Sequence, residues 1–249
     1  PPRTPWSHPE TSCCSPNALR MIASLPGYLF STSDEGLWVH FYDACSVDFH
    51  LDHKAPISLR VDTRYPWEGE ITITISSEVP EVFSLFLRIP GWCTQASVTI
   101  NGEPSGERVK PGTYCALQRE WKDGDRVNLN LAMPVVAMAV DERASESQNK
   151  VALMRGPLVY CFESQDQEGR EAWDIRVPQP SPGRRHSGSQ LYESMGEMGG
   201  ITPVYDSNLL GGMIALHGRD SAGPDFTAIP YYAWANRGPG AMRIWVNAD

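Results

Sequence analysis

Two adjacent cysteines, Cys13 and Cys14, are the residues of this sequence whose type and spacing best suit chemistry. Thiolate sulfur is a soft ligand that suits zinc, and a zinc site takes three or four protein ligands. Two neighbouring cysteines can both reach one ion only where the backbone turns sharply, and the start of a helix provides such a turn. A thiolate held by a metal at a helix N-terminus can also act as a nucleophile.

The cysteine pair also has simpler interpretations. The two thiols can lie side by side in an apolar pocket, or they can form a disulfide between neighbours. Two ligands are half of a zinc site, and the sequence contains no C-x-x-C or H-x-x-x-H pair to supply the others. All three interpretations remain open from the residues alone.

A helix is predicted directly after the cysteine pair, over residues 16–25. Ser15 suits the N-cap and Pro16 the first helical position. Leu19, Ile22 and Ala23 have the i, i+3, i+4 spacing that makes one apolar face. Pro26 and the glycine after it end or kink this helix. The cysteines are therefore expected just before a helix N-terminus.

Beyond Phe30 the apolar period changes from 3.6 to 2, which indicates strands. The turn signals are Asn101-Gly102 and the run Lys-Asp-Gly-Asp at 122–125, both of which predict hairpins. Strands separated by such signals at short, regular spacing indicate β-sandwiches. A crossing segment is expected at 134–149 and long loops at 164–200. The expected strands are 37–42, 57–62, 69–75, 82–89, 97–100, 114–119, 126–131, 151–154 and 158–162, with further strand character at 201–216 and 226–246.

Three other groups of residues could form sites. His50-Leu51-Asp52-His53 could hold a metal, although a solvated turn is the simpler interpretation. Glu68 and Glu70 could be paired carboxylates for acid–base catalysis, although a hairpin tip is the simpler interpretation. The tryptophans could stack on sugars or could pack in cores; they are Trp67, Trp92, Trp121, Trp173 and Trp234.

Composition excludes several classes of function. The net charge is −9 and there is no basic stripe, so nucleic acid is not an expected partner. The longest apolar stretch, at 131–140, is interrupted by Pro134 and falls short of the roughly 20 residues of a membrane span. The four separate cysteines are interpreted as small buried hydrophobic residues; they are Cys45, Cys93, Cys115 and Cys161.

The segment from Cys13 to Tyr28 resembles glycoside hydrolase family 127, the β-L-arabinofuranosidases and their bacterial relatives. Three later segments, at 120–125, 151–160 and 229–238, resemble the same family in the same order. The resemblance implies a mainly β chain, with two jelly-roll-like β-sandwich domains following the C-terminal remnant of an (α/α)6 barrel. The barrel remnant would be residues 1–29. The first sandwich would be 30–134 with 235–249, and the second, 135–234, would be inserted in it.

The resemblance also implies a retaining glycosidase with a zinc-bound cysteine nucleophile. The family's two adjacent cysteines match Cys13 and Cys14, which gives Cys13 the role of nucleophile and zinc ligand and Cys14 that of zinc ligand only. The third cysteine, the glutamate ligand and the acid/base glutamate of the family lie upstream of the matching region. We therefore expect this chain to be a piece of a longer enzyme and to be inactive alone, with the apolar face of its helix uncovered.

The expected partners are a carbohydrate substrate such as an arabinofuranoside, the missing N-terminal barrel segment, and a second copy in a homodimer. No signal segment is visible at the start, which favours the cytoplasm without fixing the compartment. The rival hypothesis is a non-catalytic carbohydrate-binding or structural β-sandwich protein. A degenerate remnant with neither role is a third alternative.

Overall fold

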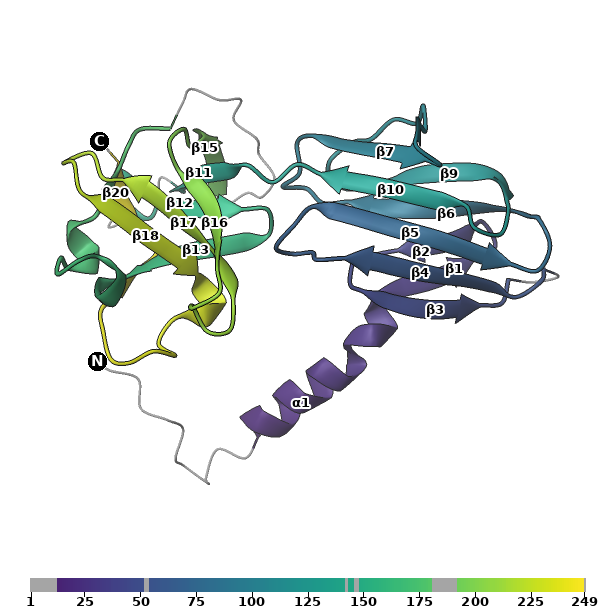
Figure 1. The fold of residues 1–249 in the computed structure, drawn as a ribbon, viewed down its shortest axis with the longest axis horizontal. Coiled ribbons are helices and arrows are strands. Elements are labelled where there is room, and N and C mark those ends of the chain that lie inside the picture. The colour runs from purple at the N-terminus through teal and green to yellow at the C-terminus, as the bar shows by residue number, and fades with distance from the viewer. Residues whose placement is uncertain (1–12, 52–53, 142, 146–147, 181–191, 249) are drawn as a thin grey trace. The chain divides into compact units, whose positions relative to one another are not determined.

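The computed structural model describes residues 13–51, 54–141, 143–145, 148–180 and 192–248. The chain divides into two compact units, and the boundary falls between Ala132 and Met133 (Figure 1). Both units are built mainly of strands that form sandwich-like domains, as the sequence predicts. Among the described residues, no helix is long and apolar enough to cross a membrane.

The first unit begins with a helix and continues as strands. Its elements are α1 (Cys14–Ser24), η1 (Leu25–Tyr28), β1 (Phe30–Ser33), β2 (Gly36–Val39), β3 (Cys45–Phe49), β4 (Ile57–Thr63), β5 (Glu70–Ser77), β6 (Glu81–Ile89), β7 (Ala96–Ile100), β8 (Glu103–Pro104), β9 (Thr113–Trp121) and β10 (Arg126–Leu131).

Helix α1 starts two residues earlier than the sequence predicts. Cys13 is its N-cap, in place of Ser15, and no side chain caps the first turn. Pro16 then falls at the third helical position. This position tolerates proline because the first backbone N–H groups of a helix have no acceptor within it. Pro26 lies in the 3₁₀ turn η1 that follows α1, where the helix was expected to end or kink.

Two sheets make the first sandwich. The four-stranded sheet has the order β1-β2-β6-β9, and the six-stranded sheet has the order β3-β4-β5-β10-β7-β8. Strict alternation puts one side of each strand inward, as in β6, where Phe83, Leu85 and Leu87 are buried. These side chains share one core with Ile73 and Val127 of the six-stranded sheet, which is why the two sheets pack face to face.

Of the two predicted hairpin turns, one is confirmed and one is wrong. Asn101 and Gly102 both adopt positive φ and join the antiparallel pair β7 and β8. The turn at 122–125 links β9 to β10, but β9 pairs with β6 and β10 with β5 and β7. Residues 122–125 therefore carry the chain from one sheet to the other, because turn residues determine a chain reversal but not the pairing of the strands that it joins.

The second unit has one branched sheet and short helical turns. Val135, Val151, Phe162 and Phe226 are among the residues that form its main core. Its elements are β11 (Val135–Val140), β12 (Lys150–Arg155), β13 (Leu158–Glu163), η3 (Ser164–Asp166), η4 (Ala172–Asp174), β14 (Arg176–Val177), β15 (Tyr192–Glu197), β16 (Thr202–Asp206), β17 (Met213–Arg219), β18 (Asp225–Pro230), η5 (Tyr231–Ala233), β19 (Met242–Arg243) and β20 (Val246–Ala248).

The expected domain arrangement needs a correction at its C-terminal end. Residues 235–249 were expected to return to the first sandwich, with 135–234 inserted in it. Instead β19 pairs with β13, and β20 pairs with β12 and β14, all within the second unit. Val246 is buried in the core of the second unit, so the C-terminal segment packs in that unit. The assignment of residues 1–29 to a barrel stays a prediction, and residues 1–12 lie outside the described ranges.

Candidate functional site

The two adjacent cysteines lie together at the start of α1. Cys13 is the N-cap and Cys14 the first helical residue, and their Sγ atoms are 3.7 Å apart. Both thiols are free and both side chains are exposed. A disulfide needs an S–S distance of about 2.05 Å, so the sulfurs are separate. Among the described residues, the pair does not lie in an apolar pocket.

The spacing of the sulfurs fits two corners of a zinc tetrahedron. Two thiolates bound to one tetrahedral zinc at about 2.3 Å each have sulfurs about 3.8 Å apart. Cys13 and Cys14 meet that spacing within 0.1 Å without any change of backbone. The donor chemistry and the separation of this pair therefore both suit zinc.

Two neighbours in the helix hold the backbone of Cys13, and sequence reasoning did not identify them. The side-chain nitrogen of Asn17 donates to the Cys13 carbonyl oxygen at 2.7 Å. A guanidinium nitrogen of Arg20 in turn donates to Asn17 Oδ1 at 2.9 Å. The i, i+4 spacing of Cys13 and Asn17 and the i, i+3 spacing of Asn17 and Arg20 are the signals that could have shown this chain of contacts.

Further metal ligands are not gathered near this pair. Among the residues that the structure describes, no three His, Cys, Asp or Glu side chains are grouped so that they could hold an ion. Cys93, Cys115 and Cys161 are buried, as expected for small hydrophobic residues, and Cys45 is half-buried. Burial raises the pKa of the Cys161 thiol to about 12, which keeps it protonated and unsuited to metal binding.

Two family models match this chain and show the protein family to which it belongs. The middle domain of β-L-arabinofuranosidase family GH127 matches residues 36–133, and the C-terminal domain of glycoside hydrolase family 127 matches residues 135–247. The chain belongs to glycoside hydrolase family 127. The family 127 matches also divide the chain almost where the structure does, between Ala132 and Met133.

Individual relatives agree with the family. A non-reducing end β-L-arabinofuranosidase of Bifidobacterium longum subsp. longum is 27% identical over 94% of this chain, which spans 36% of that protein. The crystal structure of a GH127 β-L-arabinofuranosidase from Geobacillus stearothermophilus T6 matches the whole chain with a TM-score of 0.82 and 33% identity. A second GH127 β-arabinofuranosidase matches with a TM-score of 0.82 and 29% identity. The chain spans 39% and 40% of these two solved chains.

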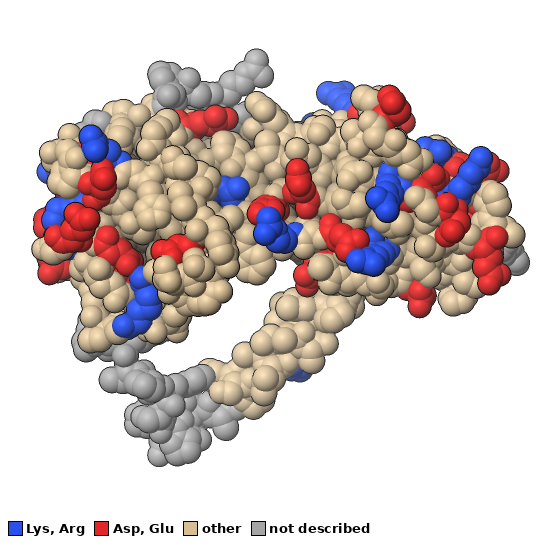
Figure 2. Space-filling view, viewed as in Figure 1, with Lys and Arg blue, Asp and Glu red and all other residues tan. Residues whose placement is uncertain are grey.

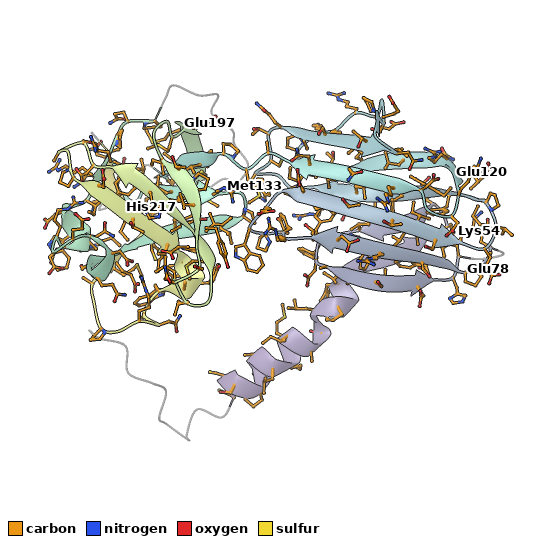
Figure 3. The ribbon with its side chains drawn as sticks, viewed as in Figure 1. Lys54, Glu78, Glu120, Met133, Glu197 and His217 are labelled. Carbon is orange, nitrogen blue, oxygen red and sulfur yellow. The ribbon has the colours of Figure 1, made fainter. Side chains whose placement is uncertain are left out.

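The histidine motif at 50–53 is only partly described. Asp52 and His53 lie outside the described residues, and His50 is exposed. His50 lines a hollow of about 510 Å³ with Asp34, Glu35 and Lys54. Figure 3 shows Lys54, Glu78 and Glu120 at the same end of the first sandwich. These residues do not form a metal cluster among the described positions.

The candidate carboxylate pair does not form an acid–base site. Glu68 is ion-paired with Arg64 in the loop between β4 and β5, and Glu70 begins β5. Gly69 between them approaches the backbone of Leu131 so closely that a Cβ atom would lie 1.9 Å from the Leu131 carbonyl oxygen. The Glu-Gly-Glu run is therefore the end of the β4–β5 hairpin, as its simpler interpretation predicts.

The buried carboxylate of Glu163 in the second unit is also fully hydrogen-bonded. Glu163 Oε1 accepts from the backbone N–H of Ala235 at 2.7 Å, and Oε2 accepts from Arg237 at 2.5 Å. Arg237 also binds both carboxylate oxygens of Asp166, at 2.7 and 2.6 Å. These hydrogen bonds, first that to Asp166, raise the pKa of Arg237 further above its usual range. With both its oxygens engaged, Glu163 anchors the loop at 231–238.

The five tryptophans do not make a sugar-stacking surface together. Trp121 is fully buried and its indole N–H donates to the Phe83 carbonyl oxygen at 3.0 Å. Trp92 packs against the first core, and Trp234 packs against a small core of the second unit. The exposed members, Trp67 and Trp173, belong to different units.

Proposed function

We propose that this chain is the middle and C-terminal part of a retaining glycoside hydrolase that acts as a β-L-arabinofuranosidase. In this proposal Cys13 is the nucleophile, and Cys13 and Cys14 are two ligands of a zinc ion. The observation that carries the proposal is the 3.7 Å separation of two exposed, free sulfurs in a chain of family 127. Its relatives include two named as β-L-arabinofuranosidases, which supports the substrate class.

The residues of this chain would contribute as follows. The Cys13 sulfur attacks the anomeric carbon, so that a C–S bond forms while the C–O bond to the leaving group breaks. The leaving oxygen takes a proton from an acid supplied by another part of the enzyme. Water then displaces the sulfur with help from the same group acting as base, which releases the sugar with retained configuration. Bound zinc would supply a deprotonated thiolate that is both a competent nucleophile and a better leaving group.

Asn17 and Arg20 would act as positioning residues in this scheme. Their hydrogen bonds hold the carbonyl of Cys13 and so the first turn of α1. Cys14 would share the metal without reacting. Cys13 and Cys14 occupy consecutive backbone positions at the start of the helix. A small rotation of the backbone at Cys13 would therefore move both sulfurs at once.

The chain alone is proposed to be inactive. The described residues offer two of the four ligands that a closed zinc site takes, and none of their carboxylates forms a metal group with the cysteines. The remaining ligands and the acid/base would come from the part of the family 127 enzyme that this chain does not span. The chain covers only 36% of the curated relative and 39% of the Geobacillus enzyme.

The test uses the longer protein and an aryl β-L-arabinofuranoside. Cys13→Ser should abolish hydrolysis, since a hydroxyl is not deprotonated under the same conditions, and Cys14→Ser should lower both bound zinc and hydrolysis. Cys45→Ser, a half-buried cysteine away from the pair, is the matched control and should retain both. Normal turnover by the Cys13→Ser enzyme would refute the nucleophile assignment.

A further inference from the structure

We infer that the outer face of the four-stranded sheet is the surface on which the domain preceding the family 127 middle domain packs. The inference rests on the proposed function, because it takes the chain to be part of a longer family 127 enzyme. It adds the contact surface, which neither the family match nor the cysteine pair specifies.

The two outer faces of the first sandwich differ in chemistry. Alternate residues on the outside of the six-stranded sheet are uniformly polar. In Figure 1 this sheet lies toward the viewer, and Figure 2 shows many charged side chains on that side. Its outward residues include Ser58, Arg60, Asp62, Thr72, Thr74, Ser76, Arg126, Asn128 and Asn130. The outer face of the six-stranded sheet is therefore polar enough to remain exposed to solvent.

The four-stranded sheet instead carries aromatic side chains outward. In its register, Ser31 lies opposite Trp38, Trp38 opposite Phe86, and Phe86 opposite Ala116, so that one row crosses all four strands. The rings of Trp38 and Phe86 stack 3.8 Å apart, and Tyr114 meets Trp38 edge-on. Partly exposed aromatic rings grouped on the outside of a sheet favour contact with another protein surface.

Hydrogen bonds fix this aromatic surface in place. Trp38 donates its indole N–H to Ser33 Oγ at 2.9 Å. The His40 ring nitrogens lie 2.8 Å from Ser31 Oγ and 2.6 Å from the Tyr114 hydroxyl. The side chains are therefore pre-ordered, which lowers the entropy lost on packing.

The ring arrangement favours a protein partner over a sugar. A sugar stacks on a flat ring face that is open to solvent. Trp38 and Phe86 use one ring face on each other, with 7° between their planes, and Tyr114 packs edge-on against Trp38, so less ring face is left for a sugar. Packed aromatic rings of this kind suit contact with the side chains of another domain.

Two observations identify the partner as the preceding domain. The family match names residues 36–133 the middle domain, so another domain comes before it in the family. Helix α1 continues through η1 directly into β1, the edge strand of this same sheet. None of its residues is buried, and Leu19 and Ile22 are 67% and 63% exposed. A single preceding domain that contacts both would cover the exposed helix and the aromatic row.

Cysteine labelling tests the inference. Ala116→Cys places a thiol in the aromatic row, and Asn130→Cys places one on the outside of the six-stranded sheet; both parent residues are exposed. In the 249-residue chain both thiols should react with maleimide at similar rates, measured by peptide mass spectrometry. In the longer protein the rate at position 116 should fall severalfold while that at 130 stays the same.

Stability provides a second measurement. Ala116→Arg should lower the unfolding temperature of the longer protein but not of the 249-residue chain, and Asn130→Arg should change neither. Equal labelling at position 116 in both proteins would overturn the inference, as would protection of the short chain by arabino-oligosaccharides. Protection at 116 in a longer protein that binds no zinc would refute the proposed function and leave the packing surface standing.

Discussion

Glu163 and Arg237 are 74 positions apart in the sequence, yet a guanidinium nitrogen of Arg237 lies 2.5 Å from Glu163 Oε2. Their side chains are 5% and 18% exposed. The contact closes the loop at 231–238 onto the end of β13, and Asp166 binds the same guanidinium. Two segments of the second unit that are far apart in the sequence therefore meet at one buried ion cluster.

Removing the cation from this cluster should destabilise the second unit. Arg237→Leu would leave Glu163 and Asp166 buried without their partner, which costs about 3–5 kcal/mol of unfolding free energy. Arg219→Leu is the matched control, because Arg219 and Asp225 form an ion pair that is 75% and 71% exposed. Such a pair contributes less than about 1 kcal/mol. Urea unfolding of both variants that gave equal losses would contradict the assignment.

Asp125, in the turn at 122–125, should make the unfolding free energy of the protein decrease at acidic pH. Burial raises the pKa of Asp125, but hydrogen bonds from Asn101 and from the Lys122 backbone outweigh it and hold the pKa below its usual value. A carboxyl with a lower pKa in the folded state stabilises the protein above its unfolded pKa of about 3.9. That contribution is lost as the pH falls through the folded pKa.

Asp125→Asn should therefore remove part of the acid sensitivity. Between pH 7 and pH 3, the unfolding free energy of the unaltered chain should fall further than that of the variant. Asp62→Asn, at an exposed ion pair with Arg60, is a suitable control. The account of Asp125 fails if its variant and the unaltered chain lose stability in parallel.

Gly69 should not tolerate a side chain. A Cβ atom there would lie 1.9 Å from the Leu131 carbonyl oxygen, and this oxygen belongs to backbone that cannot rotate away. We expect Gly69→Ala to cost about 1–3 kcal/mol, the range seen for overpacked sites. At Gly91 no atom lies within 4 Å of an added Cβ. Gly91→Ala should therefore stay within about 0.5 kcal/mol of the parent, and thermal unfolding distinguishes the two.

Strands with clean alternation, and the apolar runs of β12 and β13, were predictable from the sequence, whereas β11 and β15 were not. In β5, the alternation of Ile71, Ile73 and Ile75 with threonines marks one buried face, and the structure confirms it. The residues of β11 are Val-Val-Ala-Met-Ala-Val, which do not alternate in polarity, and residues 134–149 were predicted as a crossing segment. β15 was missed because its Tyr-Glu-Ser-Met-Gly-Glu run resembles the loops around it.

The pairing partners of the strands and the geometry of the cysteine site could not be predicted from the sequence. The two short strands β19 and β20 carry no signal that distinguishes one sheet from another, and their placement depends on which sheet edge is free. For the site, the residue types of Cys13 and Cys14 left zinc, a disulfide and a buried pair open, and zinc was predicted from the family resemblance. The 3.7 Å between the sulfurs depends on the backbone angles at the N-cap, which no composition pattern encodes.

The most direct test of the central claim is X-ray absorption at the zinc edge, with metal quantification, on the longer protein and its Cys14→Ser variant. The account predicts one zinc per chain with sulfur ligands at about 2.3 Å, and one sulfur fewer in the variant. A fully active enzyme without zinc, or a zinc environment unchanged by Cys14→Ser, would contradict it.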